Sequence, residues 1–227
     1  MFARFLLSSK CYNRTMFALL KNFFTILIFS LSTYLWSDEN PYNFIDSNAQ
    51  QMVIVLKENK SLFLEDRQLY EQKIKEIFEP MIDFRRVAAT VMGKKYYLAS
   101  SKEQRAEFVV IFKDSLLDTY AETLAQWENQ TITTIFPKDD MEIQTNNIKN
   151  IEVQQTLNTG SSKYPISYKL RKNKDNSWSI VNIIVNGVNL GLTFRNQFQA
   201  LAIKNNGNIE STLNGWVSDA GDAGISG

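Results

Sequence analysis

The side chains that most often carry enzyme chemistry are nearly missing from this chain. Its 227 residues include no His and a single Cys, Cys11. Histidine is the commonest general base and metal ligand, and a thiolate is required for cysteine catalysis and zinc-thiolate sites. Cys11 lies in an N-terminal segment that we expect to be removed, which would leave no thiol for a disulfide. The composition therefore disfavours most hydrolase and metalloenzyme mechanisms.

The remaining chemical candidates are carboxylates. Asp139 and Asp140 follow Pro137 in a polar segment, where a solvated loop is the simplest interpretation. Asp83 or Glu152 could act as a general base if the fold held it in a polar pocket, so a small exported enzyme stays open as an alternative. The sequence contains no Gly-rich phosphate loop followed by Lys and Ser or Thr, so we expect no nucleotide hydrolysis by the chain itself.

The cationic side chains give no general attraction to nucleic acid. The first 37 residues carry four basic and no acidic side chains, which leaves 21 basic against 24 acidic residues in the remainder, a net charge of −3. A mildly acidic surface does not attract phosphate backbones, so no nucleic-acid partner is expected. Arg85, Arg86 and Arg195 could each bind a single phosphate through two hydrogen bonds, although surface or interface roles are commoner.

The N-terminus has the pattern of an export signal. Lys10, Arg14 and Lys21 precede an apolar stretch at residues 23–36, and polar residues follow. That stretch is 14 residues long, whereas a membrane-spanning helix needs about 20 apolar residues, so a membrane anchor is the weaker interpretation. We predict a cleavable signal peptide at residues 1–37, with Met16 as an alternative start.

Hydrophobic periodicity predicts the elements that would position any site. Apolar residues at helical spacing predict helices, and alternating patterns predict strands. The expected helices cover residues 41–58, 66–78, 83–93 and 102–128, with Pro80 and Gly93 as interruptions and a capping box at the start of the longest. The expected strands cover residues 131–136, 148–156, 164–172 and 178–185. Four strands joined by short polar turns predict an antiparallel meander covered by helices, an α+β fold.

The last strand and the segment after it form the most informative part of the sequence. Strict alternation would place Trp178, Ile180 and Ile184 on one face of the strand and Ile183 and Val185 on the other. The chain then turns at Gly187 and continues as an amphipathic helix, whose apolar positions are Leu190, Phe194, Phe198 and Leu201. Strand and helix can therefore close over a common apolar interior.

An ordered set of residues resembles the MlaC family of periplasmic phospholipid-binding proteins, also known as toluene-tolerance or ABC transporter auxiliary proteins. The set begins with Asp83, Phe84, Val91, Met92, Gly93 and Tyr97, continues with Ser101, Glu103, Gln104, Arg105, Phe108, Phe112, Leu116, Thr119 and Tyr120, and ends with Trp178, Gly187, Val188, Phe194, Arg195, Gln197 and Phe198. It extends from about Glu65 to about Val217. The chain departs from the family pattern at Asn182, Asn186 and Asn189, where two acids and a serine are usual.

The resemblance implies a curved, four-stranded, nuclear-transport-factor-like sheet covered by helices, with an N-terminal helical subdomain. The expected division is a signal peptide at 1–37, the helical subdomain at 38–99, an α+β lipid-binding domain at 100–217 and a flexible tail at 218–227. A cavity is expected to hold the acyl chains of a phospholipid while the headgroup stays near water. The candidate lining residues are Phe84, Val87, Val91, Phe108, Phe112, Leu116, Tyr120, Ile180, Ile184, Val188, Phe194 and Phe198.

The same resemblance implies a carrier without catalytic residues, metal or cofactor. It would work in the periplasm, shuttling phospholipid between an outer-membrane lipoprotein-porin complex and an inner-membrane ABC transporter complex with its substrate-binding subunit, and so maintain outer-membrane lipid asymmetry. An aromatic stripe at helical spacing is more often solid core than cavity lining. An exported interaction module with a filled core therefore remains open beside the carrier and the enzyme.

Overall fold

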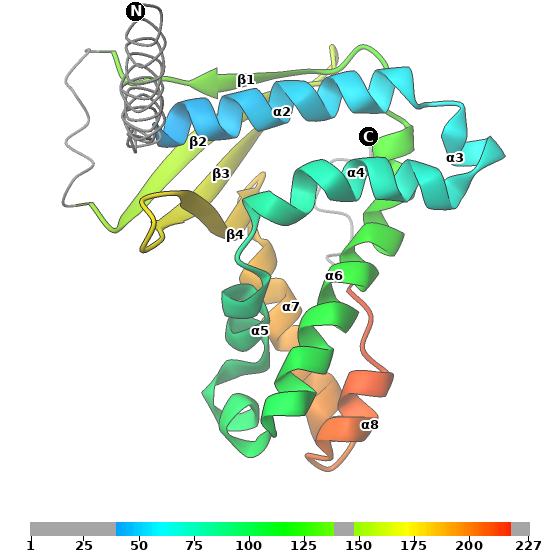
Figure 1. Cartoon of the computed structure of the whole chain (residues 1–227), viewed down its shortest axis with the longest axis vertical. Coiled ribbons are helices and arrows are strands. Elements are labelled where there is room, and N and C mark those ends of the chain that lie inside the picture. The colour runs from blue at the N-terminus through cyan, green and yellow to red at the C-terminus, as the bar shows by residue number, and fades with distance from the viewer. Residues whose placement is uncertain (1–39, 139–147, 219–227) are drawn as a thin grey trace, which may run out of the picture. The chain divides into compact units, whose positions relative to one another are not determined.

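A computed structural model describes residues 40–138 and 148–218 (Figure 1). The expected signal peptide, the Asp139-Asp140 turn and residues 219–227 of the expected tail lie outside the described residues. The first half of the described chain is helical, with α2 at Pro41–Glu58, α3 at Leu62–Glu65, α4 at Arg67–Met81, α5 at Phe84–Ala99 and α6 at Lys102–Ala125. The sequence therefore predicted the bounds of α2 and the beginning of α6 correctly.

Side-chain caps determine where these helices begin. The Asp66 carboxylate accepts a hydrogen bond from the Leu69 backbone N–H, and the Asp83 carboxylate accepts one from the Arg86 N–H. At the start of α6, Ser101 and Gln104 form a reciprocal capping box, as the sequence predicted. Each cap satisfies a backbone donor that the first helical turn leaves without a partner.

Two helices extend beyond their expected ends. Helix α4 includes Pro80 and ends at Met81, because a proline in the last turn removes only one of the final hydrogen bonds. The helical segment α5 continues to Ala99 across a kink at Gly93, whose φ of 69° is open to glycine at little cost. A Cβ at Gly93 would lie 3.3 Å from Nε of Arg195, so α7 crosses close to this kink.

The sheet is an antiparallel meander of five strands, one more than expected. It contains β1 at Thr131–Ile135, β2 at Asn150–Asn158, β3 at Lys163–Lys172, β4 at Trp178–Val185 and β5 at Val188–Asn189, paired in chain order. The additional strand arises because Asn186 and Gly187 both adopt positive φ, at 49° and 83°. A two-residue turn of this kind reverses the chain, so Val188 pairs with Val185.

A β-bulge in β4 changes which side chains face the helices. Leu170 pairs with Ile180, but the preceding residue, Lys169, pairs with Asn182, which leaves Val181 as an extra residue. One extra residue moves every later side chain to the opposite face of the sheet. The expected strict alternation is therefore wrong beyond Ile180, and Ile183 rather than Ile184 shares a face with Ile180.

The helices at the lower end of Figure 1 pack together, and the buried residues between them form a cluster rich in aromatic side chains. Helices α5 and α6 pack there with α7 (Leu190–Lys204) and α8 (Ile209–Asn214). The buried Phe108 ring lies 4.9 Å from the ring of Phe198 and 5.3 Å from that of Trp216, measured between centroids. These edge-on contacts fill the space between the helices with aromatic side chains.

The sheet and the remaining helices form the other part of the fold. Helix α2 packs on β1 and β2, while α4 contacts α2, α6 and β4. Helix α5, from the expected N-terminal subdomain, contacts α6, α7 and β4, all of which lie beyond residue 99. The domain division stays a prediction. The described residues include the first residue of the expected tail, Ser218, which is buried and whose backbone N–H donates to Oγ of Ser115.

We expect Gly191→Ala to destabilise the fold, although an alanine normally improves a helix. The Gly191 backbone N–H donates to Oδ1 of Asn182 over 3.0 Å, and an added Cβ would lie 2.5 Å from that same oxygen. The overlap should lower the free energy of unfolding by about 1–3 kcal/mol, as measured by urea denaturation. In an Asn182→Ala background the added penalty should disappear; an equal loss in both backgrounds would contradict the proposed clash.

Candidate functional site

A mainly apolar cavity of about 450 Å³ is lined by the inner face of the sheet and by helices α2, α4, α5, α6 and α7. Its volume lies within the range of about 300–1,000 Å³ that is usual for small-molecule sites. From the sheet, Tyr168 lies beside Ile183, and Ile166 lies beside Val185. The bulge in β4 is what turns Ile183 and Val185 toward this space.

Helix α2 supplies one wall of the cavity. The lining side chains of α2 are Ile45, Asn48, Ala49, Met52, Val53 and Leu56. Their spacing of three and four residues places them on one face of the helix. The alanine at position 49 is the smallest side chain on this face.

The cavity wall carries no formal charge. Among its lining residues in the described chain there is no Asp, Glu, Lys or Arg. The polar members are neutral amides, hydroxyls and a Trp indole, as at Asn48, Thr159 and Trp127. Burial raises the pKa of the Tyr168 phenol, so this group is a neutral hydrogen-bond donor at ordinary pH. Such a wall suits a hydrophobic ligand and disfavours a buried charge.

The structure places six of the twelve predicted site residues on the cavity wall. They are Val87, Phe112, Leu116, Tyr120, Ile180 and Phe194. The other six do not line it. Phe84, Val91, Phe108 and Phe198 are buried in the helical core, Ile184 lies on the outer face of β4 beside Ser167, and Val188 belongs to β5. Whether any of the twelve contacts lipid stays a prediction.

Much of the cavity wall was not predicted from the sequence. The apolar pattern of residues 41–58 was noted but not connected with a site, although Ala49, Met52, Val53 and Leu56 follow a clear helical stripe. Ile183 was assigned to the wrong face, and no local sequence signal marks the bulge. The contribution of α4, through Ile74, Phe78 and Met81, depends on how that helix packs and could not be read from periodicity.

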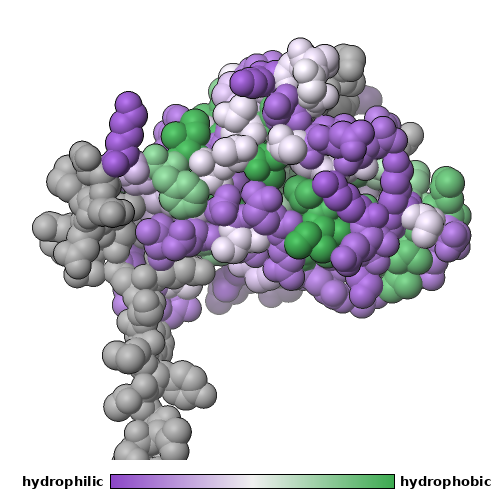
Figure 2. All heavy atoms as spheres, turned by 90° about the horizontal axis from the view of Figure 1, so that it is seen from above, coloured by the Kyte–Doolittle hydropathy of each residue, from purple (hydrophilic) through white to green (hydrophobic). Residues whose placement is uncertain are grey.

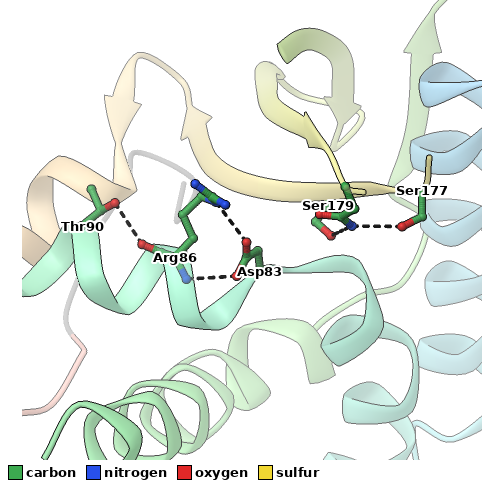
Figure 3. A network of polar contacts seen from close by, with 6 residues as sticks. Asp83, Arg86, Thr90, Ser177 and Ser179 are labelled. Atoms are coloured by element: carbon green, nitrogen blue, oxygen red, sulfur yellow. Dashed lines mark hydrogen bonds and ion pairs between the residues drawn. The ribbon is translucent and has the colours of Figure 1, made fainter. Parts of the chain in front are cut away.

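Asp83, the first candidate for a general base, is used to cap α5. Its Oδ1 accepts from the Arg86 N–H and its Oδ2 accepts from Nε of Arg86, both over 3.0 Å (Figure 3). The two side chains point toward each other in the figure, and neither lines the cavity. Asp83 therefore contributes to the start of a helix and to a local ion pair.

Glu152, the second candidate, lies on the outer face of the sheet. It accepts hydrogen bonds from Nζ of Lys169 and Oγ of Ser167 on the neighbouring strand. These bonds lower the pKa of Glu152 from its ordinary 4.5 to about 2. A carboxylate that is ionised, exposed and ion-paired cannot serve as a base inside the cavity.

The lowered pKa of Glu152 predicts a pH-dependent stability. A depressed folded-state pKa stabilises the protein above the unfolded pKa, and this contribution disappears as pH falls from about 4.5 to about 2. We expect Glu152→Gln to lower the urea midpoint modestly at neutral pH, because the ion pair is exposed, and to reduce the further loss of midpoint across this interval by the same amount. Glu107→Gln, at an exposed position of α6, is the matched control, because it makes the same substitution away from the sheet and leaves Glu152 and its partners intact. An unchanged acid dependence in Glu152→Gln would refute the assignment.

Neither a metal-binding cluster nor a membrane-spanning helix is found among the described residues. No group of three or more His, Cys, Asp or Glu side chains in residues 40–138 and 148–218 could hold a metal ion. Within the same ranges, the helices are too short or too polar to cross a bilayer.

Most of the surface seen in Figure 2 is hydrophilic. Apolar side chains on this face occur in separate groups among polar ones, rather than as a continuous patch. Exposed apolar residues in the described chain include Ile54 and Leu64, with exposed fractions of 53% and 88%. An extended hydrocarbon ligand would find little shelter on this face.

Two known proteins are similar in sequence to this chain over most of its length. The toluene tolerance protein ttg2D of Pseudomonas putida is 26% identical over 208 residues, which covers 92% of this chain and 94% of that protein. The intermembrane phospholipid transport system binding protein MlaC of Haemophilus influenzae is 25% identical over 212 residues, covering 91% and 89%.

A solved structure shows the same fold. The phospholipid-binding protein from Ralstonia solanacearum, determined in complex with a phospholipid, superposes with a TM-score of 0.68 at 22% identity, covering 78% of this chain and 94% of that one. The sequence profile of the family described as MlaC protein matches residues 46–218. The chain therefore belongs to the MlaC family.

Proposed function

We propose that this protein is a periplasmic phospholipid carrier that shelters acyl chains in the cavity beneath α2. The observation that carries the proposal is the uncharged, mainly apolar wall around about 450 Å³ of space. The names of two relatives, as a phospholipid transport binding protein and a phospholipid-binding protein, support the same ligand class.

Hydrocarbon burial explains why a carrier would have this form. Each methylene removed from water is stabilised by about 0.8 kcal/mol, so two acyl chains with about 28 methylenes face a gross cost on the order of 20 kcal/mol when they cross water unassisted. A cavity that matches the interior of a bilayer removes most of this cost. Loading and unloading then need no bond chemistry.

The charged headgroup would remain outside the cavity. A phosphate moved into a space without Lys or Arg would lose its hydration without gaining a partner, which is strongly unfavourable. The neutral polar side chains of the wall, among them Gln126, Gln130 and Thr159, suit the boundary between acyl chains and water. The carrier would thus enclose the tails and expose the head.

The proposal of a wider role is supported by family membership together with the predicted export signal. The carrier would move phospholipid across the periplasm between an outer-membrane lipoprotein-porin complex and an inner-membrane ABC transporter complex with its substrate-binding subunit. This traffic would maintain the lipid asymmetry of the outer membrane. Any ATP would be hydrolysed by the transporter.

The enzyme alternative has weaker support. It required a carboxylate base in the pocket, whereas Asp83 caps a helix and Glu152 lies on the outer face of the sheet. The interaction-module alternative required a filled interior, and the cavity argues against it.

Native mass spectrometry of protein purified from the periplasm would test the carrier function. Mass additions that match diacyl phospholipids, and lipids recovered by organic extraction, are the expected result. Protein that carries no lipid and also accepts none from phospholipid vesicles would overturn the proposal.

A further inference from the structure

One buried donor on the cavity wall has no partner within residues 40–138 and 148–218. The Nε1 atom of Trp127 is shielded from solvent and forms no hydrogen bond there. Within the same ranges, five other side chains carry a buried polar atom without a hydrogen bond, but none of them lines the cavity: they are Tyr70, Glu79, Arg105, Gln155 and Trp216. Trp127 does line it, and is therefore the residue of this group that a ligand can contact.

Trp127 lies where the cavity wall becomes polar. Gln126 and Gln130 precede and follow it in the sequence, and both also line the cavity. Thr159 joins them, because its neighbour Asn158 pairs with the residue that follows Gln130. These neutral polar side chains therefore gather beside Trp127 at one end of the cavity.

The same end of the cavity meets water. Among the described lining residues, Thr123 and Gln126 at the end of α6 are exposed, whereas the others are buried or half-buried. One step further along β1 and β2, Ile132 and Leu157 pair with each other and line the cavity with apolar side chains. Trp127 thus lies at the boundary between water and the apolar part of the wall.

The indole determines which ligand atom can pair with it. Its N–H is an uncharged group that only donates, so the ligand must bring an acceptor oxygen. A phosphate oxygen would bring its negative charge to a wall that contains no Lys or Arg of the described chain. An ester carbonyl oxygen is a neutral acceptor, and in a phospholipid it lies where each acyl chain joins the polar part of the molecule. Its place in the lipid therefore matches the place of Trp127 in the cavity.

We propose that Nε1 of Trp127 donates a hydrogen bond to an acyl-ester carbonyl of the bound lipid, so that the cavity prefers ester-linked over ether-linked chains. The inference rests on the proposed carrier function. It assigns to Trp127 a role in lipid selection, beyond its packing against the cluster that contains Leu56 and Ala121.

The test measures the ratio of two bound lipids. Delipidated wild-type protein and Trp127→Phe are each equilibrated with mixed vesicles of diacyl phosphatidylglycerol and its dialkyl ether analogue with equal chain lengths, and bound lipid is quantified by native mass spectrometry. We expect the wild type to prefer the diacyl lipid by about threefold to tenfold, the value of one hydrogen bond, and Trp127→Phe to bind the two lipids alike. The smaller phenyl ring removes apolar contacts from both lipids equally, so that loss does not change the ratio.

Trp216→Phe is the matched control. It removes another buried indole N–H that forms no hydrogen bond, at a position in the helical core that does not line the cavity. The folded fraction of this variant should keep the ester preference. An equal loss of preference in both variants would show that disturbed packing is the cause, and it would overturn the inference.

A second measurement needs no substitution. In NMR spectra of isotope-labelled wild-type protein, the assigned indole proton of Trp127 should move downfield when the diacyl lipid is added, because the proton gains an acceptor. The ether lipid should produce a smaller shift. An equal shift with both lipids would indicate the phosphate as the acceptor, and the absence of any shift would show that the indole gains no acceptor; either result would overturn the inference.

The failures of the two proposals are distinguishable. If the wild type binds neither lipid, the carrier function fails together with this inference. If it binds both lipids equally, or if Trp127→Phe keeps the ester preference, the role of Trp127 fails while the carrier function stands.

Discussion

Ala49→Trp should reduce lipid occupancy at least tenfold in a protein that remains folded. Ala49 lines the cavity from α2, and an indole at this position would enter the space that an acyl chain would fill. Excluding even two methylenes costs about 1.6 kcal/mol, which is more than a tenfold loss of affinity. Because the new ring fills empty volume, the free energy of unfolding should stay equal or rise.

The matched control for this substitution is Gln51→Trp on the same helix. Gln51 is exposed and does not line the cavity, so its replacement adds the same side chain without blocking a ligand. Bound phospholipid, measured by native mass spectrometry after incubation with vesicles, should fall only in Ala49→Trp. Full occupancy in folded Ala49→Trp would show that acyl chains bind elsewhere.

The largest loss of stability is expected from Phe108→Ala. Phe108 has an exposed fraction of 0% and packs against the rings of Phe112, Phe198 and Trp216. Removing a buried phenyl ring typically costs about 3–5 kcal/mol, a large part of the 5–15 kcal/mol that stabilises a domain. Urea denaturation should show a lower midpoint with an unchanged slope.

The same variant separates core packing from ligand binding. Phe108 does not line the cavity, so the folded fraction of Phe108→Ala should keep normal lipid occupancy. Val110→Ala, at a position of α6 that is 53% exposed, should leave both stability and occupancy nearly unchanged. A strong loss of occupancy at unchanged stability in Phe108→Ala would contradict this separation and return Phe108 to the cavity wall.

The described elements show why local patterns predicted so much of the fold. The apolar stripe of residues 102–128 and the capping box at Ser101 determined the position of α6, because both act within a few residues along the chain. The alternating strands and short polar turns likewise predicted the meander. Among the strands the two-residue β5 was missed, although Asn186-Gly187 is a strong hairpin turn, and the short helices α3 and α8 were not predicted.

The candidate site shows where local patterns were insufficient. Phe108 and Phe112 are one helical turn apart on the same stripe, yet only Phe112 lines the cavity. Both are buried, with exposed fractions of 0% and 1%, so hydrophobicity and spacing cannot separate them. The bulge at Val181 is similar, since a single extra residue reverses the inward face without changing the apolar character of the strand.

The sequence by itself determined the α+β class, most element boundaries and the resemblance that led to the MlaC family. Each of these depends on residues that interact with near neighbours or recur in a characteristic order. Only the tertiary structure decided that a space remains between α2 and the sheet, and which side chains surround it. Hydrophobic periodicity indicates which side chains are buried. Whether a cavity remains between them depends on how closely surfaces that are distant in sequence pack together.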